Sequence, residues 1–392
     1  MSTPSTNVFA SRVSQVPQSF IREILKVASN PEITSFAGGL PNPDLFPIEE
    51  LKESAANVFQ NDGKQALQYA STEGLYPLRE YISNRYLKRH NLTIPPEQIL
   101  ITNGSQQALD LIGKLFINPG DKVLVERPAY LGALQCFSMF QAQLLEVNLE
   151  HDGIDTEQLR SKLEANDVKL FYGIPNFQNP TGISYSEEKR KEAANILSNF
   201  KTIFIEDNPY GEISFTNNTH TSIYSYLPEQ TILLGSFSKT IAPGLRLGWM
   251  VAPMEIITKA TILKQASDLH TGNLTQYILS DFLKRNNPDY HISKIIKLYQ
   301  HQCEVMMNAL RNDFPSSVSY TQPKGKMFCW LTLPTGITSR ELLDRAMKEN
   351  IIFVPGDTFY AQNPDSQTLR LNFSNVDETR MIEGLKKLGD LM

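Results

Sequence analysis

The chain has few cysteines, few tryptophans and no long apolar run. Its 392 residues include two tryptophans and three cysteines, Cys136, Cys303 and Cys329. Three cysteines so far apart match neither a disulfide framework nor a zinc site, so we expect no bound metal and a reducing, cytoplasmic location. No apolar stretch approaches the ~20 residues that a membrane-spanning helix needs, so we expect no membrane partner.

Excess positive charge is also lacking. Lysine and arginine together number 37 and aspartate and glutamate 42, which gives a net charge of -5. Proteins that bind nucleic acids usually present a basic surface, so we expect no nucleic-acid partner. The first six residues, MSTPST, lack the basic and then apolar pattern of a secretory signal. The length predicts about two domains.

Strand and helix patterns alternate between residues 98 and 252, which predicts an α/β fold with a mostly parallel sheet of seven strands between helices. The predicted strands cover residues 98–102, 122–125, 144–147, 169–173, 202–205, 232–234 and 247–252. The predicted helices cover residues 105–116, 132–140, 156–165 and 186–200. Sheets of this kind bind ligands beyond the carboxyl ends of their strands.

The pattern changes after residue 290, where a smaller α+β domain is predicted. Its helices are expected at 291–314, 339–350 and 377–391, and its strands at 318–320, 327–333 and 368–373. Residues 1–45, with a short helix at 20–28, are expected to join this domain or to form an arm. We therefore divide the chain into residues 1–45, a large domain at 46–290 and a small domain at 291–392.

The segment 236–249, SFSKTIAPGLRLGW, is the most informative part of the chain. It gathers the hydroxyls of Ser236 and Ser238, the amine of Lys239 and the guanidinium of Arg246. A lysine can form an imine with an aldehyde, while hydroxyls and a guanidinium can hold a phosphate. Pyridoxal 5'-phosphate needs this combination of groups. The alternative is a surface turn with scattered polar residues.

Further polar residues follow the predicted strands. Ser105 and Gln106 open a helix, whose free N–H groups can bind a phosphate, although Ser105 could instead be a helix N-cap. Tyr130 could stack on a flat ring or could be a packing residue. Asn179 lies in the turn-forming run 176–182, and its amide can both donate and accept beside a ring hydroxyl.

Asp207 ends an apolar strand, where a carboxylate is costly unless it is paired. A protonated pyridine nitrogen is a suitable partner, and Tyr210 could bond the ring oxygen. The alternative is an acidic turn before Pro209. Arg370 stands between apolar neighbours in the predicted strand 368–373. Its planar guanidinium suits a substrate carboxylate, or it lies on a solvent-exposed edge.

These motifs together resemble those of class I/II aminotransferases of pyridoxal phosphate fold type I, in the branch of 2-aminoadipate, kynurenine and multisubstrate aminotransferases. The resemblance runs from about residue 21 to the C-terminus. Its pieces are residues 21–26, 35–41, 67–69 with Gly74, 104–108, 179–182, 206–210, 236–249, 354–356 and Arg370. It implies a homodimer with shared active sites that transfers an amino group from an L-amino acid to a 2-oxo acid, through pyridoxamine phosphate. The common acceptor would be 2-oxoglutarate.

The resemblance also implies a role for each site residue. Lys239 would bond the cofactor and move the proton, with Asp207 on the pyridine nitrogen, Asn179 and Tyr210 on the ring oxygen, and Tyr130 stacked on the ring. The phosphate would be held by Ser105, Gln106, Ser236, Ser238 and Arg246, with Tyr69 reaching in from the second subunit. The substrate α-carboxylate would bind Arg370 and Asn179 near Gly39, and Arg22 would bind a distal carboxylate.

Some alternatives stay open at this level. The same scaffold serves β-lyases and decarboxylases, and the same module occurs in transcription regulators behind a DNA-binding domain of 50 or more residues. Only about 20 residues precede the module here, so we expect an enzyme. Lys326 replaces the small residue, usually glycine, that family members carry, which affects the expected shape and charge of the substrate pocket. The preferred amino donor is not predicted.

Overall fold

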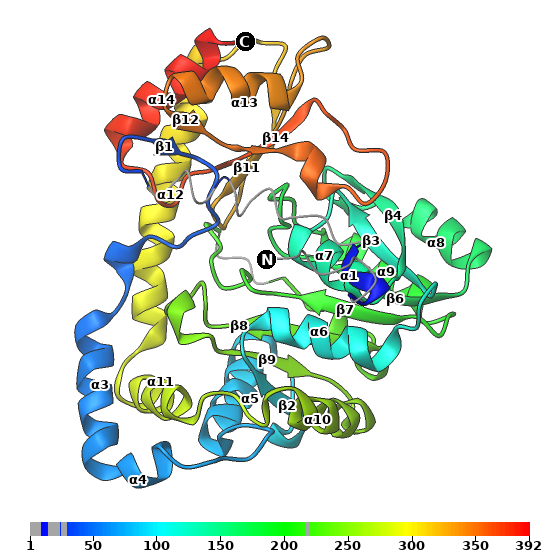
Figure 1. The fold of residues 1–392 in the computed structure, drawn as a ribbon, viewed down its shortest axis with the longest axis vertical. Helices are drawn as coiled ribbons and strands as arrows, with labels where there is room; N and C mark the ends of the chain where they lie inside the picture. The colour runs from blue at the N-terminus through cyan, green and yellow to red at the C-terminus, as the bar shows by residue number, and fades with distance from the viewer. Residues whose placement is uncertain (1–8, 15–23, 25–29, 217–219) are drawn as a thin grey trace, which may run out of the picture.

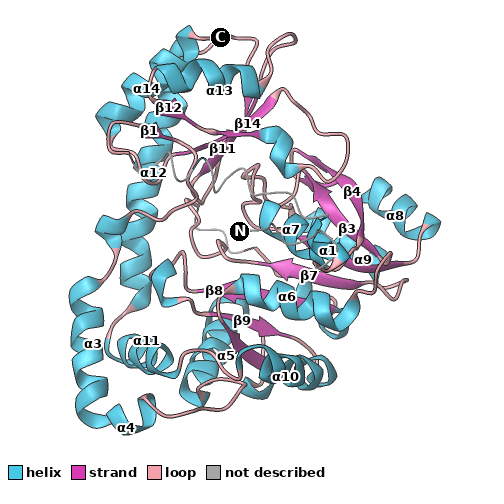
Figure 2. Ribbon diagram, viewed as in Figure 1, coloured by secondary structure: helices cyan, strands magenta, loops and turns pink. Residues whose placement is uncertain are grey.

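The computed structural model describes residues 9–14, 24, 30–216 and 220–392. These residues form an α/β structure with a large sheet, a small sheet and a short two-stranded pair (Figure 1). Helices surround the large sheet, and further helices pack beside the small one (Figure 2). No described helix is long and apolar enough to cross a membrane.

The large sheet contains eight strands. In spatial order they are β2 (Ile99–Thr102), β9 (Gly248–Val251), β8 (Thr231–Ser236), β7 (Ile203–Asp207), β6 (Val168–Gly173), β3 (Lys122–Arg127), β4 (Gln143–Glu150) and β5 (Gly153–Ile154). The neighbours from β8 to β4 pair in parallel, whereas β9 and the two-residue β5 run antiparallel to their neighbours. The seven predicted strands are therefore present, and β5 is an eighth that the sequence did not indicate.

The central strands are apolar because both of their faces are covered. Every residue of β8 is buried. Along β8, Ile232 and Leu234 join the core beneath α6 (Ser105–Phe116), α7 (Leu131–Met139) and α10 (Met254–Asp268), while Leu233 joins the core beneath α5 (Tyr76–His90) and α11 (Asn273–Arg285). Alternate side chains of a strand point to opposite faces, so a strand between two helical layers is apolar throughout.

The helices cover both faces of this sheet and link its strands. Their bounds are α3 (Ile48–Asn61), α4 (Gly63–Ala66), α5 (Tyr76–His90), α6 (Ser105–Phe116), α7 (Leu131–Met139), α8 (Thr156–Ala165), α9 (Glu187–Leu197), α10 (Met254–Asp268) and α11 (Asn273–Arg285). The side chain of Asp155 accepts a hydrogen bond from the backbone N–H of Gln158 in the first turn of α8. Ser186 accepts likewise from the backbone N–H of Lys189 in α9. Such caps determine where a helix begins. No helix or strand is predicted from the sequence within residues 46–97 or 253–290.

The small sheet is antiparallel, with the order β10 (Ser319–Tyr320), β11 (Phe328–Thr332), β14 (Thr368–Asn372) and β13 (Val354–Pro355). It shares one apolar core with α12 (Pro288–Asp313), α13 (Ser339–Lys348) and α14 (Glu378–Asp390). The strand β1 (Thr34–Ser35) pairs with β12 (Ile351–Ile352), so the chain returns beside this sheet before α3 begins. The division of the chain at residues 45 and 290 stays a prediction.

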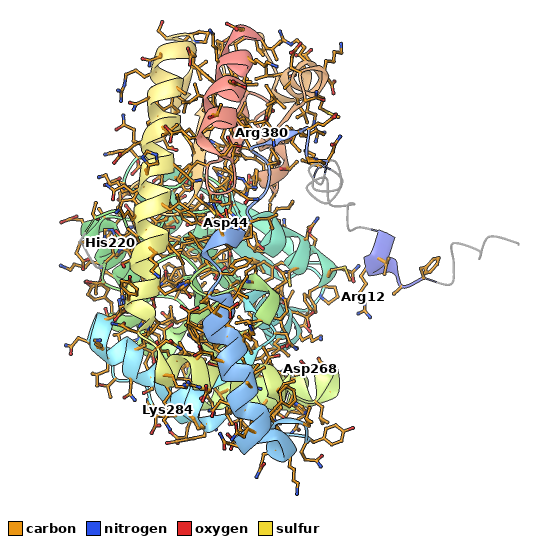
Figure 3. The ribbon with its side chains drawn as sticks, turned by 90° about the vertical axis from the view of Figure 1, so that its left-hand side faces the viewer. Arg12, Asp44, His220, Asp268, Lys284 and Arg380 are labelled. Carbon is orange, nitrogen blue, oxygen red and sulfur yellow. The ribbon has the colours of Figure 1, made fainter. Side chains whose placement is uncertain are left out.

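The helix α12 is the long element that connects the two parts of the fold. It begins beside α11 and runs up beside α14, as the side view shows (Figures 1 and 3). Asn287 caps its first turn by accepting from the backbone N–H groups of Asp289 and Tyr290. The helix therefore starts next to the large sheet and ends in the core of the small one.

Candidate active site

Nearly all the predicted site residues line one cavity of about 470 Å³. They are Gly39, Ser105, Gln106, Tyr130, Asn179, Asp207, Tyr210, Ser236, Ser238, Lys239, Arg246 and Arg370. The cavity lies between the large sheet and β11 and β14 of the small sheet, which supply Phe328 and Arg370. The roles that the resemblance gives to these residues stay predictions.

Strand ends bring these residues together. Asp207 is the last residue of β7 and Ser236 the last residue of β8. Tyr130 follows β3 directly before α7, and Asn179 lies in the loop after β6. Because these strands are parallel, their carboxyl ends meet at one edge of the sheet, where a ligand can touch all four loops.

Asp207 is buried, and its two carboxylate oxygens have different surroundings. Tyr172 donates a hydrogen bond of 2.7 Å to Oδ2, whereas Oδ1 is buried without a partner among the described residues. Burial raises the pKa of Asp207 to about 6, and the bond from Tyr172 and the charge of Lys326 act in the opposite direction. A buried carboxylate oxygen in this state suits a cationic N–H donor.

Lys239 extends its amine into the cavity and donates to the backbone oxygen of Gly39 at 2.6 Å. Burial lowers the pKa of Lys239 to about 8, and the nearby charges of Arg370 and Arg246 add to this effect. A lysine with this pKa is partly neutral near pH 7. A neutral amine is the form that attacks a carbonyl carbon or accepts a proton.

An anion site is formed where α6 begins. Gly104 precedes the helix with φ 76°, and Ser105 is the first helical residue, so the N-cap is Gly104 and not Ser105. A Cβ at position 104 would lie 2.8 Å from Nη2 of Arg246, which donates to the Asn103 carbonyl at 3.1 Å. Glycine therefore lets the guanidinium approach the helix N-terminus, whose N–H groups favour negative charge.

Arg370 connects the two sheets. From β14 it donates to Oδ1 of Asn179 at 3.0 Å and to the Ala37 carbonyl at 2.8 Å. Its buried Nε has no partner among the described residues. Its guanidinium lies 4.0 Å from the ring centroid of Phe328, and burial lowers its pKa to about 10. The remaining N–H donors can bind a carboxylate that enters the cavity.

Lys326 does not line the cavity. It is fully buried, with φ 68°, and its Nζ lies 3.8 Å from the ring centroid of Tyr210 and 4.4 Å from that of Phe328. A left-handed conformation favours glycine, which accounts for the small residue that the resemblance leads one to expect. Lys326 therefore contacts the substrate pocket only through Tyr210 and Phe328, which do line it.

Two predicted residues are not placed in the cavity. Arg22 lies outside the described residues. Tyr69 is 78% exposed, and its ring makes an edge contact with His270 at a centroid distance of 5.8 Å. The contact of Tyr69 with the phosphate of a second subunit stays a prediction.

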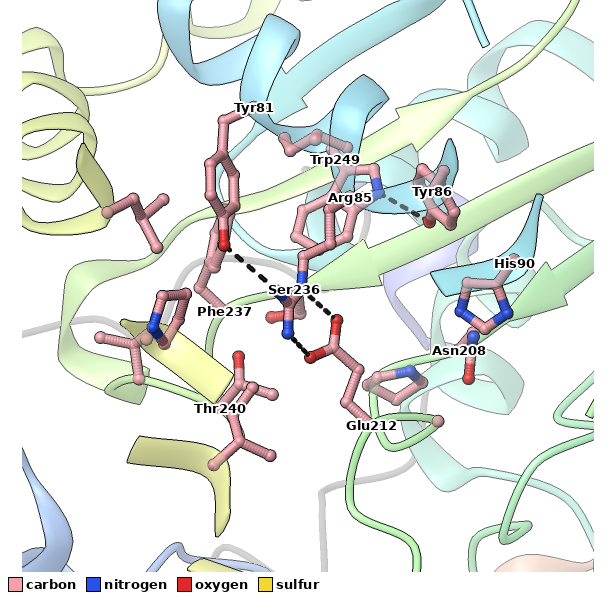
Figure 4. A pocket seen from close by; sticks show the side chains of 17 residues that line it. Tyr81, Arg85, Tyr86, His90, Asn208, Glu212, Ser236, Phe237, Thr240 and Trp249 are labelled. Atoms are coloured by element: carbon pink, nitrogen blue, oxygen red, sulfur yellow. Dashed lines mark hydrogen bonds and ion pairs between the residues drawn. The ribbon is translucent and has the colours of Figure 1, made fainter. Parts of the chain in front are cut away.

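A second cavity, of about 40 Å³, lies behind Asn208 and Ser236 (Figure 4). Arg85 donates to both carboxylate oxygens of Glu212 there, and Trp249 donates to the hydroxyl of Tyr86 at 2.9 Å. These polar groups satisfy one another. A space of this size holds a few water molecules at most, so it does not accommodate an amino acid.

Tyr172 and Phe328 belong to the site, but neither is predicted from the sequence as a site residue. Tyr172 carries a hydroxyl inside the otherwise apolar strand β6, and a buried hydroxyl needs a partner, which was an available signal. Phe328 lies in an apolar strand where many residues are equally suited to packing. Only the pairing of β11 with β14 shows that its ring contacts the guanidinium of Arg370.

The cavity suits pyridoxal 5'-phosphate on structural grounds. It offers an amine of lowered pKa, an unpartnered oxygen of a buried carboxylate and a helix N-terminus beside an arginine. The family model described as "Aminotransferase class I and II" matches residues 37–388. This chain belongs to that family.

Full-length relatives agree with this assignment. The chain is 39% identical to "Aromatic-amino-acid aminotransferase 1" of Thermococcus litoralis, over 97% of this chain and 93% of the relative. It is 38% identical to the "2-aminoadipate transaminase" of Thermus thermophilus, over 98% and 96%. The crystal structure of Pyrococcus horikoshii kynurenine aminotransferase in complex with PMP has a TM-score of 0.94 and 40% identity, over 98% of this chain and 96% of that one.

The family membership establishes the class of reaction. The protein is an aminotransferase whose cofactor is pyridoxal 5'-phosphate, and its fold is that of the type I enzymes that use this cofactor. The predicted family, fold, cofactor and amino-group transfer are therefore confirmed.

Proposed function

We propose that this aminotransferase uses 2-oxoglutarate as its common acceptor and takes its amino group from 2-aminoadipate or from large apolar and aromatic L-amino acids. The observation that carries the reaction is the cavity itself, which Lys239, Asp207 and Arg370 all line. The names of the relatives, which include an aromatic-amino-acid and a 2-aminoadipate aminotransferase, support this range of donors.

When bound, pyridoxal phosphate supplies an aldehyde carbon that bonds to amines and a ring that takes up electrons from the substrate. Lys239 would hold that carbon through Nζ, and the same Nζ would serve as the base that takes a proton from the substrate Cα. The lowered pKa of Lys239, about 8, supports this second task, because a base works best when its pKa lies near the working pH.

Asp207 would hold the ring nitrogen in its protonated form through Oδ1. Tyr172 supports this role because it occupies Oδ2 and orients the carboxylate. Glu206, the preceding residue, points to the opposite face of the sheet, where Ser222 donates to it at 2.7 Å. Of these adjacent carboxylates, only Asp207 lines the cavity.

Arg370 would bind the substrate α-carboxylate together with the amide of Asn179. The fixed bonds of Arg370 to Asn179 and to the Ala37 carbonyl hold the guanidinium in place before substrate arrives. Ser105, Gln106, Ser236, Ser238 and Arg246 would hold the phosphate, and Tyr130 and Tyr210 would contact the ring. Gly39 would lie next to the substrate, since its carbonyl already accepts from Lys239.

We further propose a homodimer in the cytoplasm, in which Tyr69 reaches the phosphate of the partner subunit. The exposure of Tyr69 outside its own cavity supports this arrangement. The three cysteines are free, which accords with a reducing compartment.

The donor and acceptor range is tested by separate half-reactions. The loaded enzyme is mixed with one amino acid alone, and the 2-oxo acid formed per active site is measured. The acceptor is then added, and glutamate is measured. One equivalent of oxo acid, followed by one of glutamate, is expected for 2-aminoadipate, leucine and aromatic donors. Release of carbon dioxide or of ammonia with pyruvate would instead indicate a decarboxylase or a β-lyase.

Arg22 is proposed to bind the distal carboxylate of dicarboxylic substrates and to withdraw for apolar donors. Loss of one charged hydrogen-bond partner costs roughly 1.5–3 kcal/mol. Arg22→Ala should therefore lower kcat/KM for 2-aminoadipate and 2-oxoglutarate by about ten- to a hundredfold. The half-reaction with leucine should change little. Equal losses for both kinds of substrate, or no loss for either, would remove Arg22 from the site.

A further inference from the structure

Lys326 occupies an unusual position behind the active site. Its side chain is fully buried, and its Nζ donates to the Phe177 carbonyl at 3.1 Å. The same nitrogen lies over the rings of Tyr210 and Phe328. Its backbone N–H donates to the Ile213 carbonyl at 2.9 Å, which places the residue, in the loop before β11, against the loop that follows β7. The amine is thus held by one carbonyl and two aromatic faces.

The charges around Lys326 belong to the active site. Burial lowers the pKa of Lys326 well below its usual value, and the charges of Arg370 and Lys239 lower it further. Asp207 and Glu126 act in the opposite direction. Glu126 is itself buried and accepts from Tyr185 at 2.7 Å and from Gln178 at 3.0 Å. Lys326 forms no ion pair with a carboxylate in the part of the chain that the structure describes.

A lysine buried without an ion pair is costly, so its contacts need an explanation. Both rings beside Lys326 line the cavity, and that of Tyr210 is the one that carries a hydroxyl able to bond the cofactor. An amine N–H over the face of an aromatic ring is attracted to its π electrons, and the amine need not be charged for this contact. By drawing electron density from the ring, it also makes the hydroxyl of a phenol a better hydrogen-bond donor.

We propose that Lys326 is a positioning residue for the aminotransferase reaction: it holds the ring of Tyr210 and strengthens the hydrogen bond that the Tyr210 hydroxyl donates to the ring oxygen of the cofactor. The inference rests on the proposed role of Tyr210. A donor to that oxygen stabilises its negative charge and so lowers the pH at which the bound cofactor loses its proton. Lys326 thereby helps to keep the cofactor reactive near pH 7.

The experiment follows the absorbance of the enzyme-bound cofactor against pH. Lys326→Met keeps most of the length of the unbranched side chain but removes the amine. The pH midpoint of the absorbance change should rise by roughly half to one unit. The turnover number should fall about three- to tenfold. Lys324→Met is the matched control, because it makes the same change two residues away at an exposed position and should leave both quantities unchanged.

Tyr210→Phe separates this inference from the proposed function. Tyr210→Phe alone should raise the midpoint by more than Lys326→Met does, and adding Lys326→Met to it should produce no further rise. A midpoint unchanged by Tyr210→Phe would overturn the role of Tyr210 and this inference with it. A shift with Tyr210→Phe but none with Lys326→Met would overturn the inference alone.

Two further results decide between a direct and an indirect effect. Equal shifts from Lys326→Met with and without the Tyr210 hydroxyl would show that the amine acts on the cofactor by its field alone, which contradicts the proposal. If Lys326→Met does not fold, Lys326→Gly replaces it, because glycine adopts the left-handed conformation at this position. The expected rise of the midpoint has the same sign, and no rise in that variant counts against the proposal.

Discussion

Asp207 illustrates how a neighbouring residue sets the chemistry of a candidate catalytic group. The carboxylate would lose much of its charge in a buried site, since burial alone raises its pKa. Tyr172 compensates in part by donating to Oδ2, and it leaves Oδ1 without a partner among the described residues. The positioning of one oxygen thus depends on a hydrogen bond to the other.

Tyr172→Phe should weaken this arrangement without removing the carboxylate. Hydrogen bonds to charged groups contribute about 1.5–3 kcal/mol, so kcat should fall by roughly ten- to a hundredfold. Single-turnover formation of oxo acid measures the effect. Tyr185→Phe is the matched control, because this equally buried tyrosine bonds Glu126 and not Asp207. Similar losses of kcat in both variants would indicate general loosening of the core instead.

Lys239 makes the stability of the cofactor-free protein depend on pH. Its pKa is about 8 in the folded chain, against the ordinary 10.5. The unfolded chain therefore binds more protons between these values, and the free energy of unfolding should rise as the pH increases from about 8 to 10.5. Below pH 8 the buried charge should cost at most about 3 kcal/mol.

Lys239→Met removes this contribution. The cofactor-free variant should be more stable than the wild-type protein at pH 7, and the difference should shrink as the pH approaches 10.5. Urea denaturation at a series of pH values measures it. A difference that does not change with pH would show that the amine is not desolvated in the folded protein.

At the scale of elements, the residue before α6 must adopt a positive φ and must also leave room for the group that is expected to bind the phosphate. Gly104 has a positive φ, and it leaves room for the guanidinium of Arg246 beside the first N–H groups of the helix. The positive end of the helix and the arginine then face the same part of the cavity. Both effects favour a bound phosphate.

Gly104→Ala should displace Arg246 and strain the backbone, so the affinity for pyridoxal phosphate should fall by about tenfold or more. Binding to the cofactor-free protein, followed by absorbance, provides the measurement. Gly120→Ala serves as the control, since Gly120 also has a positive φ, of 88°, but a Cβ there meets nothing within 4 Å. Equal losses in both variants would assign the effect to backbone strain alone.

At the scale of the whole molecule, the cavity depends on the placement of the small sheet against the large one. Arg370 comes from β14, and its bond to Asn179 connects the two sheets at the cavity. The small sheet has one apolar core, to which α12 contributes, and the large sheet has separate apolar cores of its own. A change that shifted the sheets relative to each other would separate Arg370, which is proposed to bind the substrate carboxylate, from Lys239.

The proposed dimer would add one further component to each site. Hybrids of Tyr69→Phe and Lys239→Ala subunits should contain one site with neither change, because Tyr69 would serve the site of the partner. Activity of the mixture should therefore exceed the summed activity of the two variants assayed separately. Native mass spectrometry confirms subunit exchange. No gain in activity after exchange would place the complete site within a single chain.

Much of the fold follows from local patterns. The seven predicted strands appear because buried parallel strands are apolar runs that helical segments separate. The helix α10 was not predicted, and its buried face includes the polar Thr261 and Lys264 beside Ile257 and Ala260. Its face is therefore not distinctly apolar in the sequence. The two-residue β5 is too short to leave a pattern.

The sequence by itself determined which residues are the candidates for the chemistry, because lysine, aspartate, serine and arginine at the ends of apolar strands have few other uses there. The tertiary structure alone decided how they act together. Tyr172 meets Asp207 because β6 and β7 are neighbours, and Arg370 reaches Asn179 because the small sheet packs across the cavity. Such contacts depend on the order and packing of distant segments, which no local pattern of residues specifies.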